Sequence, residues 1–228
     1  MIIDHTHPKY VERRNRLKAD FYNGAYFYSV EICKNMIPIV ETDRNWITVR
    51  AGDEAIDHSI VFVHDIDSFE RTYRYLTAYK DIIYVVGHPD MIKRAEAFGK
   101  TIYLPLSVDV EYVKQFRTEK TRDTAFAGRK AIRDGLQLPE GIDYIECRPR
   151  EEFLAEVAKY RKIYTITRGA IEAKILGCEV LSFHKRYPDP DLWQILDNKD
   201  AAKMLQRELD KIDGKRVDRN AEGNSCSA

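Results

Sequence analysis

Residues 163–182 have the sequence IYTITRGAIEAKILGCEVLS, in which an apolar strand, a short helix and a second apolar strand follow one another directly. Residues 163–166 and 179–182 are short apolar runs of the length typical of strands. Residues 169–176 between them are predicted to form a helix that ends before Gly177. This order of elements predicts a βαβ unit and therefore a parallel sheet.

The same alternation of strands and helices continues on both sides of this segment. Further strands are predicted at residues 46–50, 59–63, 81–86, 101–104, 124–127 and 144–146, and helices at 9–22, 25–37, 68–79, 89–98, 150–160 and 198–212. A polar stretch near residue 120 separates two such series. We therefore predict an α/β protein of two small, Rossmann-like doubly wound domains, residues 1–105 and 106–215, with a disordered tail at 216–228.

The bulk composition argues against several classes of protein. Lys+Arg and Asp+Glu both number 37, and this balance argues against a dedicated nucleic-acid binder. No apolar run approaches the length of a membrane span, and the N-terminus lacks the features of a signal peptide. The four cysteines are scattered without a CxxC pair, as expected of reduced thiols. We therefore expect a cytoplasmic protein.

The turn after the predicted strand 124–127 is a candidate phosphate site, because ligands of open parallel sheets bind beyond the carboxyl ends of the strands. It consists of Gly128, Arg129 and Lys130. The glycine lets a ligand approach the backbone, and the two basic side chains can neutralise a diphosphate. An ordinary turn followed by solvated basic residues is the alternative.

The segment after strand 163–166 is a second candidate, formed by Thr167, Arg168, Gly169, Ala170 and Glu172. Small residues at a helix start leave backbone N–H groups available to a phosphate, and the helix dipole adds to the attraction. The carboxylate of Glu172 could accept both hydroxyls of a ribose. In the alternative interpretation, Glu172 is a first-turn acid that complements the dipole, and Thr167 is the N-cap.

These segments resemble those of one enzyme family. Residues 167–181 resemble the donor-site helix of GT-B glycosyltransferases, in which a small or hydroxyl residue precedes an acidic–Ala pair, a Gly and an apolar strand. Residues 126–129 resemble the strand and Gly–basic turn that open the same domain. Residues 103–109 resemble the interdomain segment of the family. The resemblance extends over roughly residues 59–183.

The resemblance implies two domains that face a cleft and an enzyme that moves a sugar from a nucleotide sugar to an acceptor hydroxyl. It places Arg129 at the phosphates, the backbone of Gly169 and Ala170 beside them, and Glu172 at the ribose. No cofactor and no essential metal are expected, because the helix dipole and arginine stabilise the leaving nucleoside diphosphate. Removal of Glu172 is expected to abolish donor binding with little loss of stability.

Three features depart from the family pattern. Cys178 and Glu179 replace the usual proline after the last glycine. The region before residue 105 is much shorter than a standard acceptor domain, so the acceptor site is either reduced or completed by another subunit. No clear match exists for the second acid of the retaining enzymes. The stereochemistry and the oligomeric state therefore stay open.

Catalytic and acceptor-side candidates lie in the N-terminal half. His64 follows strand 59–63 and could take a proton from the acceptor hydroxyl, with Asp65 or Asp67 orienting its ring. A helix N-cap at Asp67 is the alternative. Asn23 and Gly24 could line the acceptor side, or they form an ordinary loop.

The sequence does not identify the acceptor, and a DNA base and a glycan are both candidate acceptors. The basic stretch at residues 9–18 could face DNA, although a solvated helix face explains it equally well. A non-catalytic GT-B-like protein that binds a nucleotide or a partner is the main alternative, and a nucleotide-sugar epimerase is a third hypothesis. The chain contains no P-loop, dinucleotide fingerprint or nucleophile elbow.

Overall fold

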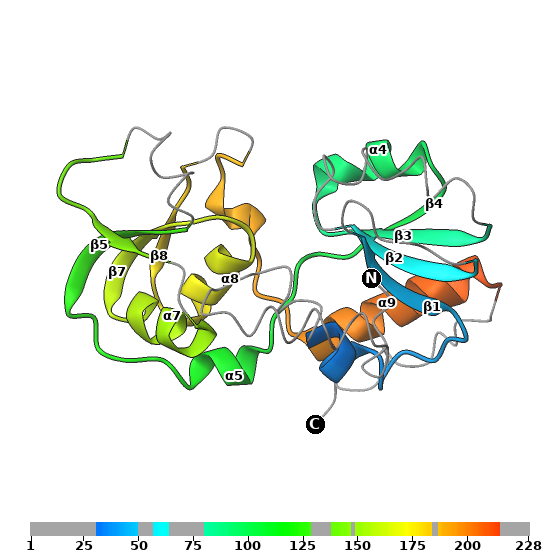
Figure 1. The fold of residues 1–228 in the computed structure, drawn as a ribbon, viewed down its shortest axis with the longest axis horizontal. Coiled ribbons are helices and arrows are strands. Elements are labelled where there is room, and N and C mark those ends of the chain that lie inside the picture. The colour runs from blue at the N-terminus through cyan, green and yellow to red at the C-terminus, as the bar shows by residue number, and fades with distance from the viewer. Residues whose placement is uncertain are drawn as a thin grey trace, which may run out of the picture.

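The computed structural model describes residues 31–49, 57–63, 80–128, 138–146, 149–183 and 187–214. Within them the chain forms two four-stranded parallel sheets with helices packed against them (Figure 1). The predicted α/β class is confirmed, and both sheets are compatible with Rossmann-like units. The predicted helices 9–22 and 68–79 and the tail at 216–228 lie outside the described residues.

The first sheet has the strand order β1-β2-β3-β4, with every neighbouring pair parallel. Its strands are β1 (Asn45–Val49), β2 (Ser59–Val63), β3 (Ile82–Val86) and β4 (Lys100–Tyr103). β2 and β3 are buried at every position, as their continuous apolar sequences predict for strands covered on both faces. β2 has its predicted bounds, whereas each of the other three differs from its predicted bounds by one residue at one or both ends.

Helical segments cover both faces of this sheet. On one face, η2 (Pro89–Met91) and α4 (Ile92–Glu96) bury Met91 and Ala95 against Tyr84 of β3. On the other face lie the short π-helix η1 (Ile32–Met36) and α9 (Asn198–Ile212). η1 occupies the end of the helix that was predicted at 25–37, whose first residues are outside the described chain.

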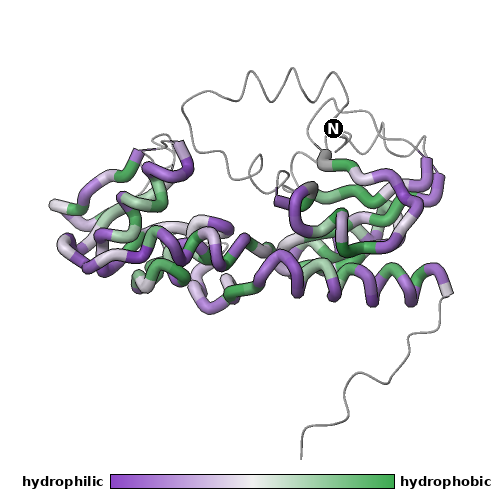
Figure 2. The backbone as a smooth tube through the Cα atoms, turned by 90° about the horizontal axis from the view of Figure 1, so that it is seen from below, coloured by the Kyte–Doolittle hydropathy of each residue, from purple (hydrophilic) through white to green (hydrophobic). Residues whose placement is uncertain are grey.

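Helix α9 lies near the C-terminal end of the sequence and packs on the N-terminal sheet. It begins where the side chain of Asp197 accepts a hydrogen bond from the backbone N–H of Lys199, and it has its predicted bounds. Its apolar side buries Leu205 and Leu209 in the same cluster as Phe62, and its other side is polar (Figure 2). The predicted boundary at residues 105 and 106 assigns this helix to the second domain, whereas it packs on the first sheet.

The second sheet has the order β6-β5-β7-β8 and is also parallel throughout. Its strands are β5 (Arg122–Ala127), β6 (Asp143–Ile145), β7 (Tyr160–Tyr164) and β8 (Glu179–Leu181), and its helices are α5 (Val110–Lys114), α7 (Arg150–Val157) and α8 (Thr167–Ile175). Helix α5 was not predicted. Helix α7 is shorter than predicted, because Tyr160 already belongs to β7.

Two connections join the units and run side by side. One leads from β4 to α5, and the other leads from the short helix η3 (Pro190–Leu192) to α9. The N–H of Val108 donates to the carbonyl of Leu196 at 3.1 Å, and the N–H of Asn198 donates to the carbonyl of Val108 at 3.1 Å. Since β4 runs directly into its connection and all strands are parallel, the carboxyl ends of the first sheet face the second unit (Figure 1).

Candidate functional site

The turn between β7 and α8 has an unusual backbone. The N-cap of α8 is Ile166 and provides no side-chain cap, so the interpretation of Thr167 as the N-cap is wrong. Thr167 itself has a φ of 58°, in the left-handed region that β-branched residues rarely adopt. Such a conformation costs about 1–3 kcal/mol and persists where the surroundings impose it, often at ligand sites.

Close packing explains the glycines of both candidate phosphate sites. A Cβ at Gly169 would lie 2.7 Å from Oγ1 of Thr165, so a side chain there requires Thr165 to move. A Cβ at Gly128 would lie 2.9 Å from the ring of Phe126, and the carbonyl of Gly128 accepts a hydrogen bond from the hydroxyl of Tyr144 at 3.0 Å. Neither glycine needs a ligand to account for its presence.

Glu172 lies on α8 and is fully buried. Its Oε1 accepts hydrogen bonds from Nε of Arg168 at 3.0 Å and from Nη2 of Arg150 at 3.1 Å. The carboxylate that the resemblance places at a ribose is therefore held by two guanidinium groups in this structure. Arg150 was not among the predicted site residues.

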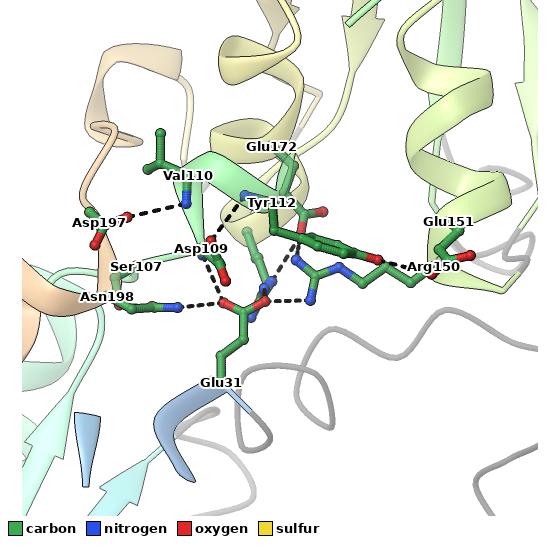
Figure 3. Close-up of polar contacts among 11 residues, drawn as sticks. Glu31, Ser107, Asp109, Val110, Tyr112, Arg150, Glu151, Glu172, Asp197 and Asn198 are labelled. Carbon is green, nitrogen blue, oxygen red and sulfur yellow. Dashed lines mark hydrogen bonds and ion pairs between the residues drawn. The ribbon is translucent and has the colours of Figure 1, made fainter. Parts of the chain in front are cut away.

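A second carboxylate, that of Glu31, completes this charged group from the N-terminal side (Figure 3). Its Oε1 accepts from Arg150 and Arg168, and its Oε2 accepts from Nδ2 of Asn198 at 2.7 Å. We call Glu31, Arg150, Arg168, Glu172 and Asn198 the junction cluster. These five residues are between 0% and 8% exposed, and their formal charges sum to zero.

Neighbouring groups hold the junction cluster in place. The hydroxyl of Ser107 donates to Oδ1 of Asn198 at 2.8 Å, which turns the amide N–H groups toward Glu31. The backbone N–H of Asp109 donates to Oε2 of Glu31 at 2.9 Å. The guanidinium of Arg150 lies 5.1 Å from the centre of the Tyr112 ring, a cation–π distance. The cluster and these neighbours therefore join η1, the first connection, the start of α9, α7 and α8.

The charge of Glu31 is maintained despite its burial. Burial alone raises the pKa of this carboxyl, but the nearby charges of Arg168 and Arg150 and the hydrogen bond from Asn198 outweigh it, so the pKa lies below its ordinary value. Glu31 is thus ionised at neutral pH. A buried ion pair of this kind is costly to break from one side, because the remaining partner keeps an uncompensated charge.

A small cavity lies between the two units near α8. It has a volume of about 10 Å³ and is lined by residues that follow β3 and β4 and by Ile171 and Trp193 of the second unit. His88, two residues after the end of β3, is 5% exposed, stacks on Tyr187 at 5.2 Å between ring centres, and meets the edge of Trp193 at 5.0 Å. Nε1 of Trp193 is buried and has no hydrogen-bond partner in the described part of the chain.

The described residues bring together part of the predicted site. Thr167, Arg168, Gly169, Ala170 and Glu172 form the first turns of α8, and Gly128 lies at the end of β5. The remaining predicted residues, His64, Asp65, Asn23, Gly24, Arg129 and Lys130, are outside the described part of the chain. The sequence reasoning missed Glu31, Arg150 and His88. Of these, His88 was detectable, because it follows a predicted strand just as His64 does.

In the described ranges, no group of three or more His, Cys, Asp or Glu side chains is arranged to hold a metal ion. No helix in these ranges combines the length and apolar character needed to cross a bilayer. The expectation that the protein needs no metal stays a prediction.

Comparison with protein-family models, with curated proteins and with solved structures found no match to this chain. A function is therefore inferred from the placement of side chains in the two units and from the sequence features described above.

Proposed function

We propose that this protein is a nucleotide-sugar-dependent glycosyltransferase of the GT-B type, with the donor bound at the start of α8 and the acceptor between the two units. One observation supports this proposal above the others. Ile171 on α8 and residues Gly87 and Leu106, which follow β3 and β4, line one cavity. The first turns of α8 in the second unit thus adjoin the carboxyl ends of the strands in the first sheet. Helix N-termini and the carboxyl ends of parallel strands are the two places where α/β proteins bind ligands.

The start of α8 has the properties of a phosphate site. The first backbone N–H groups of a helix have no partner within the helix, and Ile166 supplies no side-chain cap. The dipole of the helix favours an anion at this end, and the guanidinium of Arg168, paired in this structure with Glu31 and Glu172, is a cationic donor beside it. In the transfer step, the acceptor oxygen attacks the anomeric carbon and the bond to the diphosphate oxygen breaks. The electron pair leaves with the nucleoside diphosphate, whose charge these groups would stabilise.

The acceptor proton requires a base on the facing sheet. His64 with Asp65 remains the candidate from the sequence, and His88 is the candidate among the described residues. His88 follows β3, whose carboxyl end faces the second unit, whereas His64 is placed only by the sequence, directly after β2. His88 also lines the cavity beside Ile171. A glycan hydroxyl or a modified DNA base are the acceptor classes under this proposal.

The surroundings of Glu172 favour a different role from the ribose contact that the resemblance implies. Its carboxylate accepts from Arg150 and Arg168 and is fully buried. We assign it the task of holding these guanidiniums in position, and contact with the ribose would require it to release one of them. The same observation favours a second candidate function, a GT-B-like protein that binds a nucleotide without turnover.

A thermal-shift panel of nucleoside diphosphates and nucleotide sugars tests the proposal. A ligand at a hundred times its dissociation constant stabilises the folded chain by about 2.7 kcal/mol. We expect one base to shift the wild type, a much smaller shift in Arg168→Gln, and an unchanged shift in Arg207→Gln, which removes an arginine from the polar side of α9. Product analysis with the active nucleotide sugar then separates transfer from binding alone. Absence of a shift with every ligand would contradict the proposal.

A further inference from the structure

The carboxylate of Glu31 lies in a complete set of hydrogen-bond donors. Arg150 and Arg168 donate to Oε1, while Nδ2 of Asn198 and the backbone N–H of Asp109 donate to Oε2. Each carboxylate oxygen thus receives two donors, and the four donors come from four separate segments of the chain. We call these four donor groups the anion cradle.

The chemistry of the cradle is that of a phosphate site. Two guanidiniums, an amide and a backbone N–H group are the groups that proteins use to bind phosphate oxygens, and charge-assisted bonds from arginine are the strongest of them. A carboxylate and a phosphate present similar oxygen acceptors to such donors. The donor groups of the cradle therefore match a phosphate oxygen in chemistry, as they match the carboxylate of Glu31.

The charge balance points the same way. Arg150 and Arg168 contribute two positive charges, and Glu172 neutralises one of them through bonds of 3.1 and 3.0 Å. The second positive charge is neutralised by Glu31 alone within the junction cluster. Loss of Glu31 removes a buried negative charge from two buried guanidiniums, and this loss favours its replacement by another anion.

Glu31 and the two arginines of the cradle come from different units of the structure. Arg150 and Arg168 belong to α7 and α8 of the second unit, the N–H of Asp109 belongs to the first connection, and Asn198 is the first residue of α9. Glu31 immediately precedes η1, which packs on α9 and the first sheet. The cradle also adjoins the start of α8, because Arg168 is the second residue of that helix. An internal carboxylate from one unit therefore fills an anion site at the edge of the proposed donor site.

We propose that the anion cradle is the diphosphate-binding site and that Glu31 is an internal competitor, displaced when a diphosphate binds. The identity of the natural ligand rests on the proposed function, whereas the anion site itself does not. An internal group that fills a site about nine-tenths of the time weakens ligand binding about tenfold. Because Glu31 bonds to Arg150 and Arg168 of the second unit, its displacement removes a contact that ties the two units together.

Titration calorimetry with inorganic pyrophosphate tests this proposal. The variants are Glu31→Gln, which keeps the shape of the side chain, and Glu31→Ala, which vacates the cradle. Glu208→Gln is the matched control, because it removes one charge from an exposed ion pair with Lys211. We expect pyrophosphate to bind both Glu31 variants about tenfold or more tightly than it binds the wild type, and the control to match the wild type.

Adding Arg168→Gln to Glu31→Gln should abolish the gain, because it removes a donor of the cradle. A folded Glu31→Gln protein that binds pyrophosphate no more tightly than the wild type would overturn the proposal, as would a gain that survives the loss of Arg168. Circular dichroism establishes that each variant is folded, and Glu31→Gln alone decides the question if Glu31→Ala does not fold.

The same variants distinguish this proposal from the proposed function. A gain in pyrophosphate binding by a protein that binds no nucleotide would support the cradle and contradict the glycosyltransferase. Nucleotide binding by the wild type without any gain in the Glu31 variants would support the donor site and overturn the role of Glu31.

Discussion

Glu31 and Arg168 stand 137 positions apart in the sequence and form a buried ion pair where the two units meet. The same oxygen of Glu31 also accepts from Arg150 of helix α7. A side chain from the N-terminal unit thus connects two helices of the second unit. This arrangement makes the junction cluster a part of the stability of the chain as well as a candidate ligand site.

Loss of Glu172 should be costly to stability. Glu172→Ala leaves the guanidiniums of Arg150 and Arg168 with one carboxylate between them, and breaking a buried pair from one side costs about 3–5 kcal/mol. The sequence alone predicted little loss, because it placed this carboxylate in a ligand site. Urea unfolding measures the change, and Glu179→Ala is the control, since Glu179 forms an exposed pair with Lys162 at 3.6 Å. A loss below about 1 kcal/mol in Glu172→Ala would contradict the buried cluster.

The start of α8 should not tolerate a side chain at Gly169. In Gly169→Ala the new Cβ meets Oγ1 of Thr165, and such overpacking costs about 1–3 kcal/mol, partly offset by the better helix propensity of alanine. The double variant with Thr165→Ala should lose less stability than the two single variants together. Chemical denaturation of all three proteins gives the coupling energy. Strict additivity would show that the two positions do not touch.

The first sheet should depend on the C-terminal helix. Leu205 of α9 is fully buried in the cluster that contains Phe62, so Leu205→Ala should cost about 2–5 kcal/mol. Arg207→Ala on the same helix, with its side chain on the polar side, should change stability by less than about 0.5 kcal/mol. A fragment that ends at residue 105 lacks α9 and should show no cooperative unfolding transition. A cooperatively folded fragment would instead support the domain boundary predicted from the sequence.

Stability should fall with rising pH through the titration of His58. Its ring nitrogens lie 3.0 Å from Asp43 and 2.6 Å from Asp81, and these hydrogen bonds, that of Asp43 first, raise its pKa above 6.5. The charged ring therefore stabilises the folded state fully below pH 6.5, and this contribution is lost as pH rises through the folded-state pKa. Unfolding free energies of the wild type and His58→Gln should converge with increasing pH. A difference that grows with pH would have the wrong sign for this pairing.

The sequence predicted elements more reliably than their assembly. β2 follows from five consecutive apolar or small residues, and both β2 and α9 have their predicted bounds. The apolar side of α9 predicts that the helix is buried, but it does not identify the sheet on which the helix packs. That sheet is formed by residues much earlier in the sequence. The backbone of Thr167 also departs from its intrinsic preference, because a β-branched side chain disfavours a φ of 58°.

The junction cluster shows why the site was only partly predictable. Arg168 and Glu172 are one helical turn apart, so their pairing follows from the sequence spacing. Glu31 makes its side-chain contacts with residues 78 to 167 positions away, and nothing in its local sequence distinguishes it from a surface glutamate. Arg150 likewise stands at the start of a helix, where the helix dipole does not favour a basic residue.

The most direct test of the central claim is a nuclear magnetic resonance titration of the isotopically labelled protein with a nucleoside diphosphate. If the donor phosphates bind at the start of α8, the backbone amide signals of Gly169 and Ala170 should shift with a common dissociation constant, while those near His58 at the opposite end of the first sheet stay in place. Amide shifts confined to other regions, or no shifts with any nucleoside diphosphate, would contradict the account.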